Sequence, residues 1–300
     1  MNTSTIKRVT GLLVIEVVNS NPNGNPDQES DPRVRSNGLG EISPVSFKRK
    51  LRDLVEWQEG PVYNYAVENL TNVPEGYEFQ ILEARGRDRN SIVKELNAGQ
   101  EEGKFSQEKF LTSPFVRKYW DGRLFGNTFL EDGGEKGFIK TGVAQFGMGL
   151  SICPVIIQRQ TNTNKAGVQK DKKGGMAPLA YRVVEHGVYV MPFFVNPSLA
   201  HNSGCKACDV ELLRKLIPYA YEHTRSAIRP DVRIRHSWWM EHRSPLGSCP
   251  DYKLIDALTP KRKGDDDSAP SESWSDYDVP SGLPEDLYKK VDCVDLIEGL

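Results

Sequence analysis

The clearest apolar run lies near the N-terminus, where residues 8–18 (RVTGLLVIEVV) are rich in β-branched side chains. A run of this length and composition predicts a buried β-strand. Residues 20–40 (SNPNGNPDQESDPRVRSNGLG) are dominated by Asn, Gly and Pro, which predicts a long irregular loop. Residues 43–57 then show apolar side chains at helical spacing. Ser43 is the expected N-cap of this helix, and Pro44 its first residue.

The predicted helix is amphipathic. Its apolar face holds Phe47, Leu51, Leu54 and Val55. The opposite face, expected to lie in solvent, carries Lys48, Arg49 and Arg52. These cations, added to the free N–H groups of a helix N-terminus, favour an anion site, and an ordinary solvated helix face is the alternative.

The rest of the chain alternates between strand-like and helix-like patterns. Residues 113–127 predict a second amphipathic helix ending near Gly122. Residues 136–158 alternate small and apolar side chains, and their glycines indicate bulges or close approach of the backbone. Further strands are expected at 187–197 and 232–240, and the longest helix is expected over 209–228, capped by Asp209 and bent at Pro218.

This order predicts an α+β fold, a sheet with helices on one face, of which the ferredoxin-like β-α-β-β-α-β arrangement is the simplest version. Residues 60–110 are mixed and polar, with helical features at 90–98. Residues 261–286 are acidic and rich in Ser and Pro, as in segments that stay disordered until a partner binds. The C-terminal segment 287–300 fits a strand or a short helix.

Composition narrows the class of protein. The 300 residues are 38% hydrophobic and 27% charged, as expected of a globular protein, and the N-terminus lacks the apolar core of a signal peptide, which favours a cytoplasmic location. Five cysteines at irregular spacing do not indicate a disulfide scaffold. The formal charge of −2 conceals a strong local segregation of charge. No phosphate-binding loop, nucleophile elbow or zinc-protease motif occurs in the sequence.

The strongest local charge lies in residues 158–182, between two predicted strands. This insertion holds one acidic residue, Asp171, against six basic ones: Arg159, Lys165, Lys170, Lys172, Lys173 and Arg182. An arm with such an excess of positive charge is typical of phosphate binding. Met176 is expected at the tip of the arm, where it would wedge beside a base, contact a neighbouring subunit or fold back onto its own domain.

The segment VRIRHSWW alternates as a strand, with Arg233 and Arg235 on one face. Trp238 and Trp239 could stack on bases, although packing in a core or an interface is the more common use of tryptophan.

The sequence contains two groups of residues that could bind a metal. His201, Cys205 and Cys208 make half of a zinc site, but the sequence offers no second half at matched spacing. Asp27 and Asp31 in the first loop could hold a divalent metal beside a phosphodiester, whereas Asp among Asn, Gly and Pro is also what turns use.

Five motifs occur in a set order along the chain. They are NSNPNGNPD (19–27), PVSFKRKLRD (44–53), GRLFGN (122–127), GVAQFGMGLSICPV (142–155) and HTRSAIRPD (223–231). As a set they resemble the backbone subunit of type I CRISPR Cascade complexes, a branch of the RAMP superfamily, and the type I-C and I-B branch most of all. The resemblance covers most of residues 8–235.

The resemblance implies a modified ferredoxin-like, or RRM-like, palm over residues 1–260, with a finger or web at 60–110 and a thumb at 158–182. It implies that several copies assemble helically along one CRISPR RNA, with the thumb of one copy reaching the next. The protein would contact the guide backbone, while base pairing of the guide with target DNA supplies sequence recognition. The large, small and end-capping Cascade subunits are further expected partners. No cofactor, metal or membrane is expected.

The function implied is therefore a non-catalytic, RNA-binding filament subunit. The expected RNA-binding residues are Asn21, Asn23, Ser46, Lys48, Arg49, Arg52, Gln145, Arg159, Lys165, Lys170, Lys172, Lys173, Met176 and Arg233. Relatives in type III complexes cleave RNA with an aspartate in the equivalent first loop, so a metal-dependent RNA-cleaving subunit using Asp31 or Asp27 is the alternative. A solitary RNA-binding protein of ferredoxin-like fold is a third hypothesis.

Overall fold

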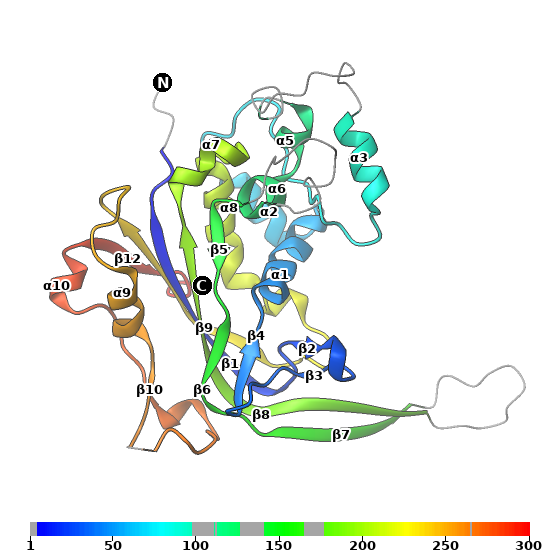
Figure 1. The fold of residues 1–300 in the computed structure, drawn as a ribbon, viewed down its shortest axis with the longest axis vertical. Helices are drawn as coiled ribbons and strands as arrows, with labels where there is room; N and C mark the ends of the chain where they lie inside the picture. Colours follow the sequence, from blue (N-terminus) through cyan, green and yellow to red (C-terminus); the bar gives the residue numbers. More distant parts are fainter. Residues whose placement is uncertain (1–4, 98–110, 112, 127–140, 165–176, 265) are drawn as a thin grey trace, which may run out of the picture.

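The centre of the molecule is an eight-stranded sheet (Figure 1). The computed structural model describes residues 5–97, 111, 113–126, 141–164, 177–264 and 266–300. The strands run in the order β12-β9-β1-β8-β6-β4, with β5 and β7 also pairing with β8, and every pairing is antiparallel. They are β1 (Val9–Ser20), β4 (Leu39–Ile42), β5 (Ala144–Phe146), β6 (Gly149–Pro154), β7 (Ile157–Asn164), β8 (Ala177–Val195), β9 (Val232–His242) and β12 (Val291–Asp295). The α+β prediction is confirmed.

Strand β1 lies inside the sheet, between β8 and β9. Leu13 and Ile15 face the core under the helices, whereas Leu12 and Val14 face a second core on the other side. All four side chains are fully buried. Burial on both faces explains why this strand is a continuous apolar run and does not alternate with polar residues.

Helices cover one face of the sheet (Figure 1). Three of these helices are α1 (Pro44–Glu56), α2 (Pro61–Glu68) and α8 (Ala207–Leu216), and all three contribute buried side chains to this core. Further helices lie around them: α3 (Arg89–Asn97), α5 (Pro114–Lys118), α6 (Trp120–Phe125) and α7 (Ala200–Ser203). The start of α1 is as predicted, since Ser43 is its N-cap and accepts a hydrogen bond from the Ser46 N–H at 3.2 Å.

The C-terminal part of the chain covers the other face of the sheet. This C-terminal cover comprises α9 (Asp251–Leu258), β10 (Lys261–Arg262), β11 (Tyr277–Asp278) and α10 (Glu285–Tyr288). Leu254, Tyr277 and Leu287 are buried against the sheet in the same core as Leu12. Residues 261–286, whose composition is typical of segments that stay disordered until a partner binds, pack against the sheet through the buried Tyr277 in their described part. The strand alternative for 287–300 is confirmed by β12.

Two predicted helices have different limits in the structure. The segment 113–127 forms α5 and α6 in place of one helix, and α6 continues through Gly122 to Phe125. The helix expected over 209–228 is α8, which ends at Leu216. Pro218 lies in a short 3-10 turn (Ile217–Tyr219), because proline lacks the N–H that the next helical hydrogen bond needs.

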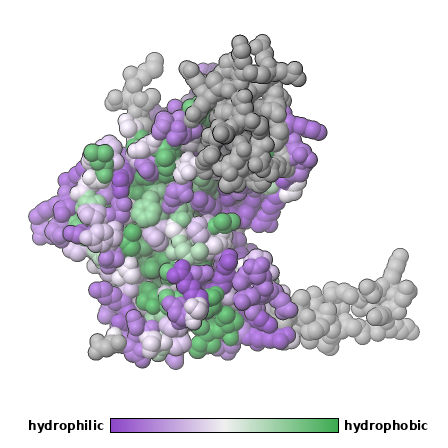
Figure 2. Space-filling model, viewed as in Figure 1, coloured by the Kyte–Doolittle hydropathy of each residue, from purple (hydrophilic) through white to green (hydrophobic). Residues whose placement is uncertain are grey.

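Strands β7 and β8 extend beyond the rest of the sheet as a two-stranded ribbon (Figure 1). Figure 2 shows the same side of the molecule, with hydrophobic residues along its middle and hydrophilic residues on both flanks. Two exposed apolar residues, Ile156 and Ile157, lie at the base of the ribbon. Among the described residues, no helix has the length and apolar character needed to cross a membrane.

Candidate nucleic-acid interface

Two asparagines fix the first loop: Asn23 holds it against the start of α1, and Asn21 closes it on itself. Asn23 Oδ1 accepts a hydrogen bond from the Ser43 N–H at 2.7 Å, and Asn21 Nδ2 donates to the Ser30 carbonyl at 2.7 Å. Both asparagines are buried, with 6% and 1% of their surface exposed. Their side chains therefore shape the loop and position the helix N-terminus. This arrangement gives both residues a structural role whether or not RNA is bound.

Two of the predicted α1 cations are neutralised within the molecule. Arg52 is buried and forms ion pairs with Asp121 at 2.9 Å and Glu83 at 3.0 Å, so the expectation that it faces solvent is wrong. Arg49 Nε donates to Asp53 at 2.7 Å, and the Arg49 side chain also pairs with Glu56. The helical pattern placed these arginines opposite the apolar face. The partners of Arg49 lie on α1 itself, but the pattern could not show that Asp121 of α6 and Glu83 cover Arg52.

The two lysines of α1 differ from the arginines. Lys48 is half-buried with its ammonium 5.0 Å from the centre of the Phe125 ring, and Lys50 is only 8% exposed. Within the described residues, neither lysine has an ion pair. Burial, together with the charge of Arg52, lowers the pKa of Lys48 to about 8. Burial, together with the charge of Arg229, lowers the pKa of Lys50 to about 8.

Lys50 and Arg229 form the cationic site that the sequence prediction missed. Arg229 Nε donates to the Asn21 carbonyl at 2.9 Å, which ties the turn before β9 to the first loop. Burial also lowers the pKa of Arg229. Its only described side-chain hydrogen bond is to a neutral carbonyl. The signal for Lys50 was present in the sequence, since it lies three residues after Phe47, at the edge of the apolar face.

The first loop is also fixed to the ribbon. Asp31 accepts a hydrogen bond from Arg182 Nη1, and Glu29 lies 3.9 Å from Arg182 Nη2. Arg159 is exposed on β7, directly opposite Arg182. The other predicted arm residues, Lys165, Lys170, Lys172, Lys173 and Met176, lie outside the described residues.

The acidic residues of the first loop do not form a metal cluster with other described residues. Asp27 is exposed at the start of a short 3-10 turn, where Asn25 Oδ1 accepts the hydrogen bond of its N–H. Asp31 has Arg182 as its partner. No group of three or more His, Cys, Asp or Glu side chains suited to a metal occurs in the part of the chain that the structure describes.

His201, Cys205 and Cys208, the possible half of a zinc site, are not grouped as metal ligands in the described part of the chain. Cys205 and Cys208 are buried in the core under the helices, and burial raises the pKa of the Cys208 thiol to about 12. His201 is exposed, and its Nδ1 lies 2.6 Å from the Ser198 carbonyl. These cysteines therefore serve as small core side chains.

Gln145 lies on β5, where its side chain donates to the Gly142 carbonyl at 3.0 Å. The close backbone approach expected for this segment is present. A Cβ atom on Gly142 would lie 2.2 Å from the Phe125 carbonyl carbon, so only glycine fits there. Gln145 thus stabilises the tight contact between β5 and α6.

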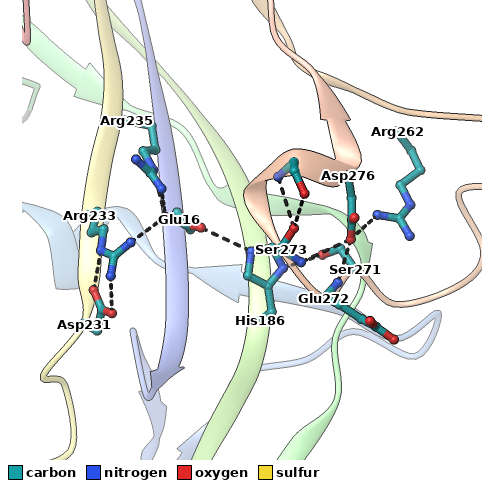
Figure 3. A network of polar contacts seen from close by, with 11 residues as sticks. Glu16, His186, Asp231, Arg233, Arg235, Arg262, Ser271, Glu272, Ser273 and Asp276 are labelled. Atoms are coloured by element: carbon teal, nitrogen blue, oxygen red, sulfur yellow. Dashed lines mark hydrogen bonds and ion pairs between the residues drawn. The ribbon is translucent and has the colours of Figure 1, made fainter.

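Arg233 belongs to a self-neutralised network around Glu16 (Figure 3). It pairs with Asp231 at 2.6 Å and lies 3.4 Å from Glu16, which also pairs with Arg235 at 2.7 Å. Burial of Glu16 acts to raise its pKa, but hydrogen bonds from His186 and Arg235 hold that pKa at about 2. Arg233 therefore has two carboxylates beside it, a weaker position for phosphate binding than that of Lys50.

The same network attaches the C-terminal cover to the sheet. His186 lies between Glu16 and Ser271, with its Nδ1 2.8 Å from the Ser271 hydroxyl (Figure 3). Trp238 and Trp239 are buried in the two cores, so both take the packing role that was the alternative to base stacking.

Comparison with known proteins identifies the family. The family model for "CRISPR-associated protein Cas7" matches residues 7–281. Curated proteins gave no match. Among solved structures, a chain of "CRISPR RNA-guided surveillance complex, pre-nicking" is similar at 14% identity and a TM-score of 0.45, over 78% of each chain.

Two further structures show weaker similarity. A chain of "CRISPR RNA-guided surveillance complex" matches at 13% identity and a TM-score of 0.35, over 84% of this chain and 77% of that one. A chain of "Cryo-EM structure of the Type III-B Cmr-beta bound to cognate target RNA" matches at 8% identity and a TM-score of 0.39, over 78% and 61%. From the family match over most of its length, the chain belongs to the CRISPR-associated Cas7 family.

Proposed function

We propose that this protein is a non-catalytic backbone subunit of a type I CRISPR effector, which assembles in several copies along a guide RNA and presents it to target DNA. The observation that carries the proposal is the set of cations around α1, Lys48, Lys50 and Arg229, which have no ion-pair partner among the described residues. A polyanion supplies the missing counter-charge at neutral pH. The large, small and end-capping subunits of such a complex are the further partners we expect.

The topology supports a ferredoxin-like palm as part of this proposal. The strands β1, β6, β8 and β9, taken with α1 and α8, follow the chain order β-α-β-β-α-β. In space they run β9-β1-β8-β6, so that each of the two β-α-β units encloses one antiparallel strand. On this interpretation, the β7–β8 ribbon with residues 158–182 is the thumb and residues 60–110 are the finger or web.

The charge arrangement favours contacts with the RNA backbone over reading of bases. The described candidates are cations and helix N–H groups, which recognise phosphate regardless of sequence. The C-terminal cover also fills the sheet face opposite the helices, which is the face that RNA-binding domains with stacking aromatics use. Sequence recognition is then left to the guide.

The first experiment replaces the unpaired cations. We expect Lys50→Glu with Arg229→Glu to remove co-purifying RNA and to reduce the slope of log affinity against log salt by about one for each cation lost. Lys253→Glu, on the exposed face of α9, is the matched control. Full RNA retention in a folded double variant would contradict the proposal. Arg52 is unsuitable for this test because its ion pair with Asp121 is buried.

A second experiment addresses catalysis. The proposal of a non-catalytic subunit is supported by the pairing of Asp31 with Arg182, which occupies the carboxylate most suited to a metal in the first loop. The purified assembly is incubated with complementary RNA and Mg²⁺, and intact RNA is the expected result. Periodic cleavage that Asp31→Ala abolishes would instead establish the RNA-cleaving type III-like alternative.

A further inference from the structure

An acidic segment follows directly after the basic part of α1. Residues 53–84 contain seven Asp and Glu residues and no Lys, Arg or His. The side chains of Glu59 and Glu68 are exposed, and neither has an ion pair with another described residue. This part of the helical layer therefore attracts cations and repels phosphate, the reverse of the start of α1.

A cleft lies within the acidic segment, where α1 ends. It has a volume of about 440 Å³ and is lined by Val55, Glu56, Trp57, Gln58, Glu59, Gln80, Ile81 and Ala84. Trp57 is 59% exposed, although tryptophan is usually among the more buried residues. A Cβ atom added to Gly60 would come within 2.8 Å of the indole, so the backbone at Gly60 supports one side of the ring. The cleft therefore presents a supported aromatic surface to solvent.

The polar groups of the cleft are mainly hydrogen-bond acceptors. Gln58 Nε2 donates to the Phe79 carbonyl at 3.3 Å, and Gln80 Nε2 donates to the Glu78 carboxylate at 2.7 Å. These contacts use the amide donors and leave the two amide oxygens without a described donor. The carboxylate of Glu59 also has no described donor. A ligand that fits this lining supplies hydrogen-bond donors.

The cations nearest the cleft are already paired. Arg49 contacts Asp53 and Glu56, and Arg85 contacts Asp53. The C-terminal end of α1 adds a partial negative charge to the uncompensated Glu59. An indole beside carboxylate and amide oxygens suits an arginine or lysine side chain, through a cation–π contact and charge-assisted hydrogen bonds.

The extent of the negative charge favours a ligand with several cations. Glu68 belongs to α2 and does not line the cleft, so a single cation on Trp57 leaves this carboxylate unbalanced. A basic peptide segment matches the whole pattern, with one side chain in the cleft and others over the carboxylates around it. The same charge disfavours a nucleic acid as the ligand.

We propose that the cleft formed by Trp57, Glu59 and Gln80 is a docking site for a basic segment of a different protein, which places one arginine or lysine on the indole. The inference goes beyond the proposed function and does not depend on RNA binding, because the cleft uses none of the cations around Lys50. One face of the helical layer then holds a polyanion, while this cleft holds a polycation.

The test is a peptide titration of the RNA-free protein. The probe is a fluorescein-labelled hexapeptide of alternating arginine and alanine, and its binding is followed by fluorescence anisotropy. We expect Glu59→Lys and Trp57→Ala each to raise the dissociation constant roughly tenfold to a hundredfold, since each removes a central contact. Trp57→Phe, which keeps an aromatic face for the cation, should retain most of the affinity.

Glu68→Lys is the matched control, because it changes the net charge by the same amount at an exposed site outside the cleft. Its effect on the dissociation constant should be about twofold to threefold, as for a screened surface charge. Equal losses with Glu59→Lys and Glu68→Lys would show that overall charge attracts the peptide, and would overturn the inference. Absence of saturable binding to the unmodified protein would overturn it as well.

Two further titrations distinguish other occupants of the cleft. Spermidine should displace the peptide only weakly, and the peptide should bind equally to protein on a short RNA and on a long RNA. Displacement by spermidine at the affinity of the peptide would assign the cleft to a free polyamine. Peptide binding that is lost only on the long RNA would show that a second copy covers the cleft. Either result would overturn the inference, whereas failure of the unmodified protein to bind RNA would contradict only the proposed function.

Discussion

Helix α1 offers a comparison between two groups of cations on one element. Arg49 pairs with Asp53 of the same helix, and Arg52 is buried against Asp121 of α6. On the side facing the turn before β9, Lys50 is equally buried but lies beside Arg229, another cation. The first group forms ion pairs without a ligand. Lys50 and Arg229 have no ion pair with another described residue, although the charge of Asp53 acts on both. Cationic side chains therefore indicate a binding site only where the fold leaves them without carboxylate partners.

The largest effect on folding stability is expected when Arg52 is replaced. Arg52→Ala leaves the buried Asp121 without its cationic partner, a change that typically destabilises a protein by about 3–5 kcal/mol. Urea denaturation measures the loss. Arg85→Ala is the control, because Arg85 pairs with Asp53 in an exposed position and its loss is expected to cost about 0–1 kcal/mol. Equal effects of the two substitutions would show that burial does not distinguish these pairs.

Replacing Lys50 is expected to change the stability of the protein in the opposite direction. Lys50→Met removes a buried charge that has no described carboxylate partner and keeps the aliphatic part of the side chain. The free protein should become more stable by about 1–2 kcal/mol, while RNA binding weakens. The two measurements are a urea titration and an RNA binding isotherm on the same preparation. Destabilisation together with unchanged RNA binding would assign Lys50 a purely structural role.

The contrast between the cations of α1 shows which features the sequence could predict and which it could not. Strand β1, the cap at Ser43 and the start of α1 depend on neighbouring residues, so their patterns were sufficient. The partner of Arg52 could not be found in this way, because Asp121 is distant in the chain and reaches α1 only through the packing of α6. The same limit applied to the C-terminal cover, whose acidic, Ser- and Pro-rich composition concealed the buried Tyr277.

The candidate site, too, could be predicted only in part from the sequence. The loop and the basic helix were predicted as one anion-binding region, and the structure brings the loop and the start of α1 together. Within the region, the structure pairs the predicted Arg52 with the buried Asp121, whereas Lys50 and Arg229, which the prediction did not include, have no ion pair with another described residue. Helical periodicity assigns a residue to a face of its helix but does not show which other segment covers that face.

The lowered pKa values of the two lysines predict an unusual pH dependence. Lys48 and Lys50 have pKa values of about 8 in the folded protein, against 10.5 for ordinary lysine. Their charged forms therefore oppose folding, so stability should rise as the pH increases from 8 towards 10.5. RNA binding should show the reverse, because it needs the charged forms and weakens above pH 8.

Lys50→Arg tests this dependence, since arginine remains charged over the whole interval. Fluorescence anisotropy with a short RNA between pH 7 and 9.5 should show a loss of affinity for the unmodified protein, at most about tenfold per pH unit for each lysine, and a shallower loss for the variant. Identical curves would exclude Lys50 as a titrating contact.

The smallest effect is expected at the pair that joins the first loop to the ribbon. Asp31 and Arg182 are partly exposed, so a double-mutant cycle with Asp31→Ala and Arg182→Ala should give a coupling energy of about 0.2–1 kcal/mol in urea denaturation. Because this pair sets where the ribbon leaves the body, both single variants should also broaden the particle-mass distribution of the RNA-bound assembly to the same extent. Stabilisation of the unmodified protein by Mg²⁺, lost with Asp31→Ala but retained with Arg182→Ala, would show that Asp31 is a metal ligand and that its contact with Arg182 is secondary.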